Sequence, residues 1–185
     1  MKRAILLVAV LAFSLSMFGQ EGMPLQIFGG YQHMSNYSVG QSGWLASANY
    51  DINHWLGVEG DLSGAYGTQN LGTVATILPG VPNNIHSRMH MFNVGPRATY
   101  RPASSDKWNA FGHLLFGYAH TNVSATGGGQ GDSAFAWGLG AGAKYFITDH
   151  IGGQAQLDEM HTSFFSHGDW HPRIALGVVY RFGTK

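Results

Sequence analysis

The stretch Arg173–Phe182, close to the end of the chain, constrains the fold most strongly. Successive side chains of a β-strand point to opposite faces, so this stretch is read with a period of two. One face is then apolar along its whole length: Ile174, Leu176, Val178, Tyr180 and Phe182. The other face carries Arg173 and Arg181, separated by small residues. This arrangement is typical of a strand with lipid on one side and a narrow polar lumen on the other.

Earlier segments show the same alternation. Together with the closing strand, the predicted strands are 25–33, 43–50, 55–66, 88–100, 108–120, 133–146, 151–161 and 173–182. The connections after the second, fourth and sixth strands are short, whereas the others are longer and polar or glycine-rich: about 34–42, 67–87, 121–132 and 162–170. Connections that differ in length between the two ends are typical of outer-membrane barrels. The sequence therefore predicts an all-β fold, an eight-stranded antiparallel up-and-down transmembrane β-barrel.

Two segments depart from simple alternation. Pro96 cannot donate a backbone hydrogen bond, so we expect a bulge or another irregularity in the strand that contains it. The segment 108–120 is weakly phased. There we assign alternate residues to the two faces, with Leu114, Phe116 and Tyr118 pointing outward and Phe111, His113 and Leu115 pointing inward.

The composition supports a membrane barrel. Charged residues make up 11% of the chain, whereas ordinary soluble domains contain about 25%. Lysine and arginine together balance aspartate and glutamate at ten each, so there is no basic field to attract nucleic acid. Beyond the N-terminal segment, no apolar run is long enough for a membrane-spanning helix. The chain has no cysteine, which excludes a disulfide framework.

The N-terminus has the layout of a secretory signal peptide. Met1–Arg3 is basic, the following residues to Leu15 are apolar, and small residues suited to cleavage come next. Such a segment is removed from the mature protein and takes no part in its fold. We therefore predict a signal peptide over residues 1–19 and a barrel domain over residues 20–185.

Charged residues also fall on the faces predicted to point inward. They are Glu59, Asp61, Arg97, Lys144, Asp158, Arg173 and Arg181. The lumen of so small a barrel is filled by side chains and leaves no wide pore. Buried charges are tolerated when they are paired and hydrogen-bonded. We therefore expect these residues to form one or more ion-pair networks in a filled polar lumen.

Taken together, the chain resembles the small outer-membrane β-barrel family, which includes the OmpA-type transmembrane domain and OmpX. The resemblance covers about Leu25 to Phe182, and its motif is the closing strand with Val178, Tyr180 and Phe182. In the family this strand is the signal read by the outer-membrane assembly machinery. The family usually ends on the aromatic residue, whereas here residues 183–185 follow.

The resemblance implies a monomer in the cell outer membrane, in contact with outer-membrane lipid and lipopolysaccharide. It implies no cofactor. The expected role is structural or interactive, with four surface loops whose partner the sequence does not name. Two alternatives remain open. One is a soluble, lipocalin-like ligand-binding barrel, in which the aromatic residues would line an apolar cavity.

The second alternative is an enzyme. His161 and Ser163 are two residues apart and so share one face of a strand, as a base and its nucleophile require. The outer-membrane lipid A deacylases carry a similar His-x-Ser on an eight-stranded barrel. Their motif continues with asparagine, but Phe164 follows here. We predict a protein without enzymatic activity.

Histidines concentrate near the ends of the strands that face the long connections. His167, Asp169 and His171 lie within five residues of one another, a spacing compatible with a transition metal. The interpretation that we adopt is simpler: polar residues hydrogen-bonded to water, lipopolysaccharide or one another. We therefore predict no metal site, with these three residues as the candidates if one exists.

Overall fold

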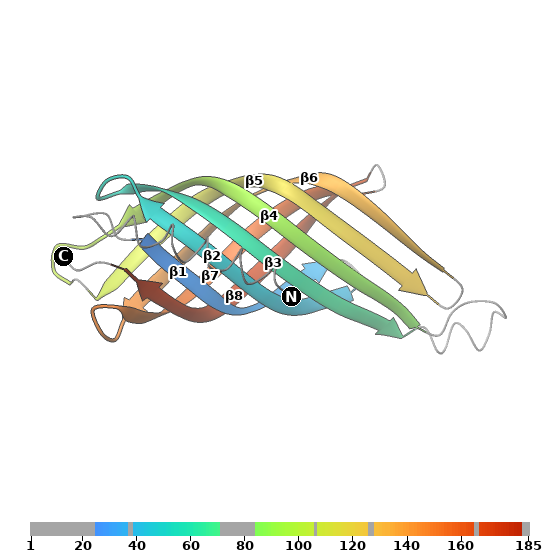
Figure 1. The fold of residues 1–185 in the computed structure, drawn as a ribbon, viewed down its shortest axis with the longest axis horizontal. Helices are drawn as coiled ribbons and strands as arrows, with labels where there is room; N and C mark the ends of the chain where they lie inside the picture. Colours follow the sequence, from blue (N-terminus) through green and yellow to red (C-terminus); the bar gives the residue numbers. More distant parts are fainter. Residues whose placement is uncertain are drawn as a thin grey trace, which may run out of the picture.

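The chain forms a closed barrel in which each strand pairs antiparallel with the next, and β1 pairs with β8 (Figure 1). The computed structural model describes residues 25–36, 39–70, 84–105, 107–125, 128–164 and 167–182. The strands are β1 Leu25–Asn36, β2 Val39–Asp51, β3 Leu56–Asn70, β4 Asn84–Tyr100, β5 Trp108–Ala125, β6 Gly128–Phe146, β7 Ile151–Phe164 and β8 His167–Arg181. The predicted fold class is confirmed.

The predicted faces are also confirmed. On β8, Leu176 and Val178 are 55% and 59% exposed, whereas Arg173 and Ala175 are 1% exposed. The weakly phased β5 follows the assignment as well, since Phe116 and Tyr118 are exposed and His113 is buried. Apolar side chains that are exposed all around a closed barrel have no protein to pack against, so lipid is their natural surrounding.

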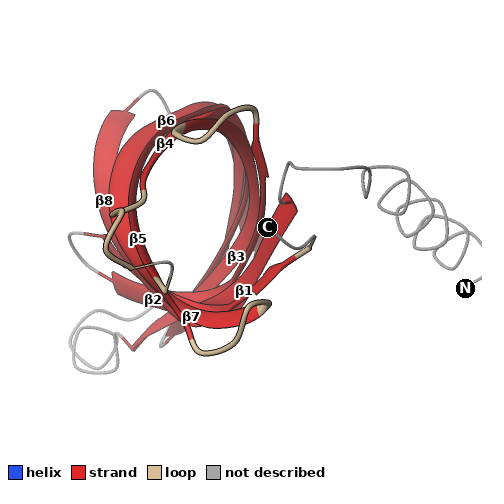
Figure 2. Ribbon diagram, turned by 90° about the vertical axis from the view of Figure 1, so that its left-hand side faces the viewer, coloured by secondary structure: helices blue, strands red, loops and turns tan. Residues whose placement is uncertain are grey.

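The two ends of the barrel differ. The short turns that join β2 to β3, β4 to β5 and β6 to β7 surround one opening, which we call the turn end (Figure 2). At the opposite end, which we call the distal end, the hairpins β1–β2, β3–β4, β5–β6 and β7–β8 meet. Within the described ranges, no helix is long and apolar enough to cross a membrane. The predicted signal peptide lies outside the described residues and stays a prediction.

Three of the four predicted long connections, 34–42, 121–132 and 162–170, are mostly strand, which corrects our expectation of loops there. Pairing continues to Asn36↔Val39, Ala125↔Gly128 and Phe164↔His167, so two residues separate the paired ends of each of these hairpins. In β3 and β4, pairing reaches Asn70↔Asn84, and residues 71–83 lie outside the described residues. Alternation marks a strand only where its two faces meet different surroundings. Beyond the lipid both faces are polar, so the signal is lost while the hydrogen-bonded ladder continues.

Pro96 produces an irregularity without a bulge. It pairs with Val58 on β3, but Gly95 and Pro96 have no partners on β5. The register of β4 against β5 is the same on both sides of this gap, at Val94↔Phe116 and Arg97↔His113. A bulge would have shifted the register by one residue. Because proline has no N–H, the pairing with β5 is interrupted at this position. The side chains of β4 on both sides of the gap nevertheless keep the same alternation of faces.

The seam that closes the barrel depends on two opposed glycines, Gly30 on β1 and Gly177 on β8. A Cβ on Gly177 would lie 2.3 Å from the Gly29 carbonyl oxygen and 2.4 Å from the Gly30 Cα. A Cβ on Gly30 would lie 2.3 Å from the Leu176 carbonyl oxygen. These contacts involve backbone atoms, which cannot rotate away as a side chain can. The two strands therefore approach more closely than alanine would allow.

We expect Gly177→Ala to lower the free energy of unfolding by about 1–3 kcal/mol, because the added methyl group forces the closing strands apart. Equilibrium urea unfolding of the barrel in lipid vesicles measures the change. Gly29→Ala is the matched control, because nothing lies within 4 Å of a Cβ at that position. Equal stability of the two variants would contradict the close approach at the seam.

Candidate functional site: a charged network across the lumen

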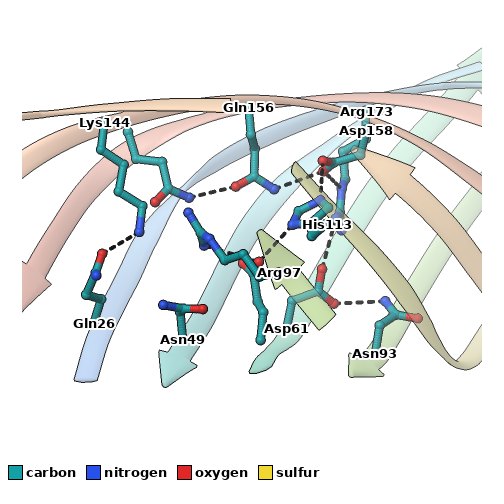
Figure 3. Close-up of polar contacts among 12 residues, drawn as sticks. Gln26, Asn49, Asp61, Asn93, Arg97, His113, Lys144, Gln156, Asp158 and Arg173 are labelled. Atoms are coloured by element: carbon teal, nitrogen blue, oxygen red, sulfur yellow. Dashed lines mark hydrogen bonds and ion pairs between the residues drawn. The ribbon is translucent and has the colours of Figure 1, made fainter. Parts of the chain in front are cut away.

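A chain of ion pairs crosses the lumen between strands that are far apart around the barrel (Figure 3). Arg97 Nη1 on β4 lies 3.1 Å from Glu59 Oε2 on β3. The same carboxylate oxygen lies 2.8 Å from His113 Nδ1 on β5. The other ring nitrogen, Nε2, lies 2.9 Å from Asp158 Oδ1 on β7. His113 therefore joins two carboxylates that come from opposite parts of the wall.

Arg173 extends this chain to β8. Its Nε lies 2.7 Å from Asp158 Oδ2, and its Nη2 lies 2.9 Å from Asp61 Oδ2. Asn93 donates from Nδ2 to the other oxygen of Asp61 at 2.8 Å. Gln156 also donates to Asp158 Oδ2 at 2.9 Å. One guanidinium thus bridges two buried carboxylates, and neutral amides complete the coordination of both.

The remaining two predicted basic residues lie nearer the turn end. Lys144 donates to Gln26 Oε1, and Gln26 in turn donates to Asp51 Oδ2 at 3.1 Å. Arg101 also pairs with Asp51. The guanidinium of Arg181 lies over the ring of Phe146, 3.7 Å from its centroid. Within the described part of the chain, Lys144 has no carboxylate oxygen within 4.0 Å, so the seven predicted residues do not form one ion-pair network.

Sequence reasoning missed the residue at the centre of the network. His113 was assigned to the inward face, but it was not counted among the charged residues of the lumen. Its signal was available, because an imidazole at an inward position between acids on other strands is a natural bridge: both ring nitrogens can hydrogen-bond. Asp51 and Arg101 were missed because the sequence pattern places each of them in a short turn between two strands.

Apolar side chains fill the lumen beside the network. Toward the distal end, one buried cluster contains Met34, Met89, Met91, Ala119, Ala136 and Met160. A second cluster joins Phe28, Leu45 and Ala175. Each of these side chains is at most 4% exposed. Methionine adapts its shape to irregular gaps, so it packs well in a narrow and tapering lumen.

The candidate nucleophile and base lie on the outward face at the distal end. His161 is packed between two aromatic rings, with centroid distances of 5.7 Å to Trp137 and 4.9 Å to Trp170. Ser163 is exposed on the same face of β7. Asp169 pairs with Thr162, whose side chain is buried on the inward face. Asp169 therefore lies on the other side of the wall from His161 and Ser163, whereas Glu159 shares their outward face two residues before His161.

The candidate metal ligands lie on β8. Asp169 and His171 share the inward face, and the buried His171 ring has its Nε2 2.8 Å from Thr162 Oγ1. The side chain of His167 lies outside the described side chains. Among those that are described, no three histidine, cysteine, aspartate or glutamate side chains gather closely enough to hold a metal ion.

The closing-strand motif faces lipid at the turn end. Val178, Tyr180 and Phe182 are exposed on the outward face, and the rings of Tyr180 and Phe182 meet edge to face at 4.7 Å. The Phe182 N–H donates to the carbonyl of Leu25 at 2.8 Å, which continues the β1–β8 seam past the last strand residue.

Known proteins share this architecture. The model of the outer membrane protein β-barrel domain matches residues 5–182. Neisserial surface protein A is 14% identical over 88% of this chain and 98% of its own, with a TM-score of 0.62. OprG from Pseudomonas aeruginosa is 12% identical over 90% and 99%, with a TM-score of 0.58.

A third similar structure contains a bound ligand. The attachment invasion locus protein Ail of Yersinia pestis, in complex with the heparin analogue sucrose octasulfate, is 15% identical over 88% of this chain and 100% of its own, with a TM-score of 0.57. No curated protein sequence matches this chain. At these identities the structures establish the fold, and the family model accounts for nearly the whole chain. The chain therefore belongs to the outer membrane β-barrel protein family and is a protein of the bacterial outer membrane.

Proposed function

We propose that this barrel is a closed structural element of the outer membrane that uses its distal end for interactions. The observation that carries the proposal is the chain of side chains running from Glu59 through His113 and Asp158 to Arg173. These residues come from β3, β5, β7 and β8, and each is at most 6% exposed. Together with the methionine cluster they occupy the space through which a solute would have to pass.

The outer surface supports a set of membrane contacts. The apolar wall suits outer-membrane lipid, and the polar hairpins at the distal end suit lipopolysaccharide. Val178, Tyr180 and Phe182 are accessible on the closing strand, as recognition by the outer-membrane assembly machinery requires. All strand edges are paired within the barrel, so the fold needs no second subunit to complete it. We infer that the protein works as a monomer.

A non-enzymatic role follows from the placement of the His-x-Ser pair. A serine nucleophile needs a base, and the base needs a group that orients it. His161 is instead enclosed by Trp137 and Trp170, Asp169 lies on the opposite face of the wall, and among the described residues no hydrogen bond joins Glu159 to His161. We therefore favour a structural role over a deacylase.

Planar-bilayer recordings test the closed lumen. We expect the unmodified barrel to show no steady ion conductance, because the network and the methionines fill the lumen. The positive control is the triple variant His113→Ala, Met91→Ala, Met160→Ala, which removes side-chain volume at two levels and should conduct. Heat-modifiable gel migration would show that both proteins are folded. If the unmodified barrel conducts as well as the triple variant, the closed-barrel proposal is wrong.

A further inference from the structure

The outward face changes character at one level near the distal end. On β1 to β6, the outward residue just beyond the last large aromatic is a histidine or a hydroxyl residue: His33, Ser42, Thr68, His90, His120 and Ser133. With His86 and His161 included, five histidines lie outside the barrel at this end, and we call them the histidine belt: His33, His86, His90, His120 and His161. Aromatic residues mark the edge of the apolar layer, so the belt lies at the depth of the lipid headgroups.

Three members of the belt are held by the neighbouring strand. His33 Nδ1 lies 2.9 Å from Ser42 Oγ, and His120 Nδ1 lies 2.8 Å from Ser133 Oγ. His86 Nδ1 lies 3.0 Å from Thr68 Oγ1. Where the hydroxyl donates to Nδ1, the ring proton is on Nε2, which can then donate to a group outside the barrel. The same contact repeated on three hairpins presents oriented donors to the surrounding headgroups.

The outward surface at the distal end also carries an arginine, Arg88. It is the only lysine or arginine on the outward face of the described strands, and its guanidinium has no hydrogen-bond or ion-pair partner among the described residues. His86 and His90 flank it on the same face of β4, and its cross-strand partners are Tyr66 and Asn122. The described outward faces of β3, β4 and β5 carry no aspartate or glutamate that could neutralise it.

A surface pocket of about 300 Å³ opens beside this arginine. It is lined by Tyr66, Gly67, Thr68, His86, Ser87 and Arg88. These residues come from β3 and β4, whose distal ends lie side by side (Figure 1). The pocket thus combines one fixed positive charge with an imidazole and hydroxyl groups, and its lining residues Tyr66, Thr68, His86 and Arg88 lie on the outward face of the wall. This is the donor set that binds phosphate esters, for which arginine is especially suited.

We propose that this pocket binds a phosphate group of lipid A, the phosphorylated glycolipid of the outer leaflet. Arg88 would contact the phosphate, with the Nε2–H of His86 as an additional donor whose ring is oriented by Thr68, and with the neighbouring belt histidines around the sugar. The depth of the site selects a lipid phosphate, because a headgroup lies beside the pocket at this level while the acyl chains pack on the apolar wall below. The inference rests on the proposed contact with lipopolysaccharide and names where on the barrel that contact is specific.

Native mass spectrometry of the purified, folded barrel in detergent tests the site with three probes: diphosphorylated lipid A, fully dephosphorylated lipid A and inorganic phosphate. We expect the unmodified protein to retain diphosphorylated lipid A about tenfold more tightly than the dephosphorylated form. Arg88→Gln should lose about tenfold in affinity for diphosphorylated lipid A. Lys107→Gln removes the same charge from an exposed position at the turn end and should stay within about twofold of the unmodified protein.

Gel migration before and after boiling would establish that each variant is folded. Retention of lipid A by Arg88→Gln at the level of the unmodified protein would overturn the site while leaving the general contact with lipopolysaccharide in place. An unmodified barrel that binds both lipid A forms equally would likewise overturn the site alone, whereas one that retains neither form would overturn the site and that contact together. Inorganic phosphate that binds as tightly as lipid A would show a site for a free anion and would overturn the assignment to lipid.

Discussion

Arg173→Met is expected to lower the free energy of unfolding by about 3–5 kcal/mol, the usual cost of removing one partner from a buried ion pair. Arg173 is 1% exposed and bridges Asp61 and Asp158. Methionine keeps much of the side-chain length but supplies no charge, so two carboxylates would lose their shared cation inside the barrel. Urea unfolding in lipid vesicles, followed by tryptophan fluorescence, measures the difference.

Two further variants show whether this loss comes from the network. Lys107→Met removes an exposed charge at the turn end and should change stability by no more than about 1 kcal/mol. Asp61→Asn in the Arg173→Met background should recover part of the lost free energy of unfolding. It removes one of the two carboxylate charges that no longer have Arg173 as a partner. Additive effects of Asp61→Asn and Arg173→Met would mean that the two residues are not coupled.

Leu176→Arg is expected to cost about 2–4 kcal/mol, as for a charge placed on the lipid face near the membrane midplane. Leu176 lies in the middle of β8 with 55% of its surface exposed. In water an exposed leucine tolerates arginine readily, so a large cost would identify the surrounding medium as hydrocarbon. The same unfolding measurement applies.

Depth along the wall supplies the control for Leu176→Arg. Ser163→Arg places the same side chain on the exposed outward face of the neighbouring strand at the distal end. There the cost should fall to about 0–1 kcal/mol, as it does near the membrane interface. Leu176→Ala separates the loss of apolar area from the gain of charge. Similar costs for the two arginine variants would place Leu176 outside the apolar layer.

The sequence was sufficient for the parts of the fold where lipid and lumen impose different chemistry on alternate residues. In β8, the alternation of Arg173, Ile174, Ala175 and Leu176 assigns each side chain to its face, and the structure agrees. Strand ends beyond the lipid could not be predicted in this way. The stretch from Thr121 to Ala125 has no large apolar side chain on either face, so its pairing with β6 leaves no periodic signal.

The sequence predicts which residues line the candidate site, but it does not predict which of these residues contact one another. That Glu59, Asp158 and Arg173 point inward follows from parity along single strands. Which of them meet depends on the tilt of the strands and on distances across the lumen, and neither can be read from one strand at a time. His113 illustrates the difference: its face was assigned from the sequence, whereas its role as a bridge appears only when β3, β5 and β7 enclose the same space.

The paired ends of the distal hairpins bear on how this surface would recognise a partner. In the β1–β2, β5–β6 and β7–β8 hairpins, two residues separate the last paired residue of one strand from the first paired residue of the next. A mobile loop that binds must first give up its conformational freedom, and the lost entropy subtracts from affinity. A ribbon already fixed by its ladder has little freedom left to lose. Such hairpins would bind a partner at a small entropic cost, because the geometry of the ribbons sets the spacing of contacts in advance.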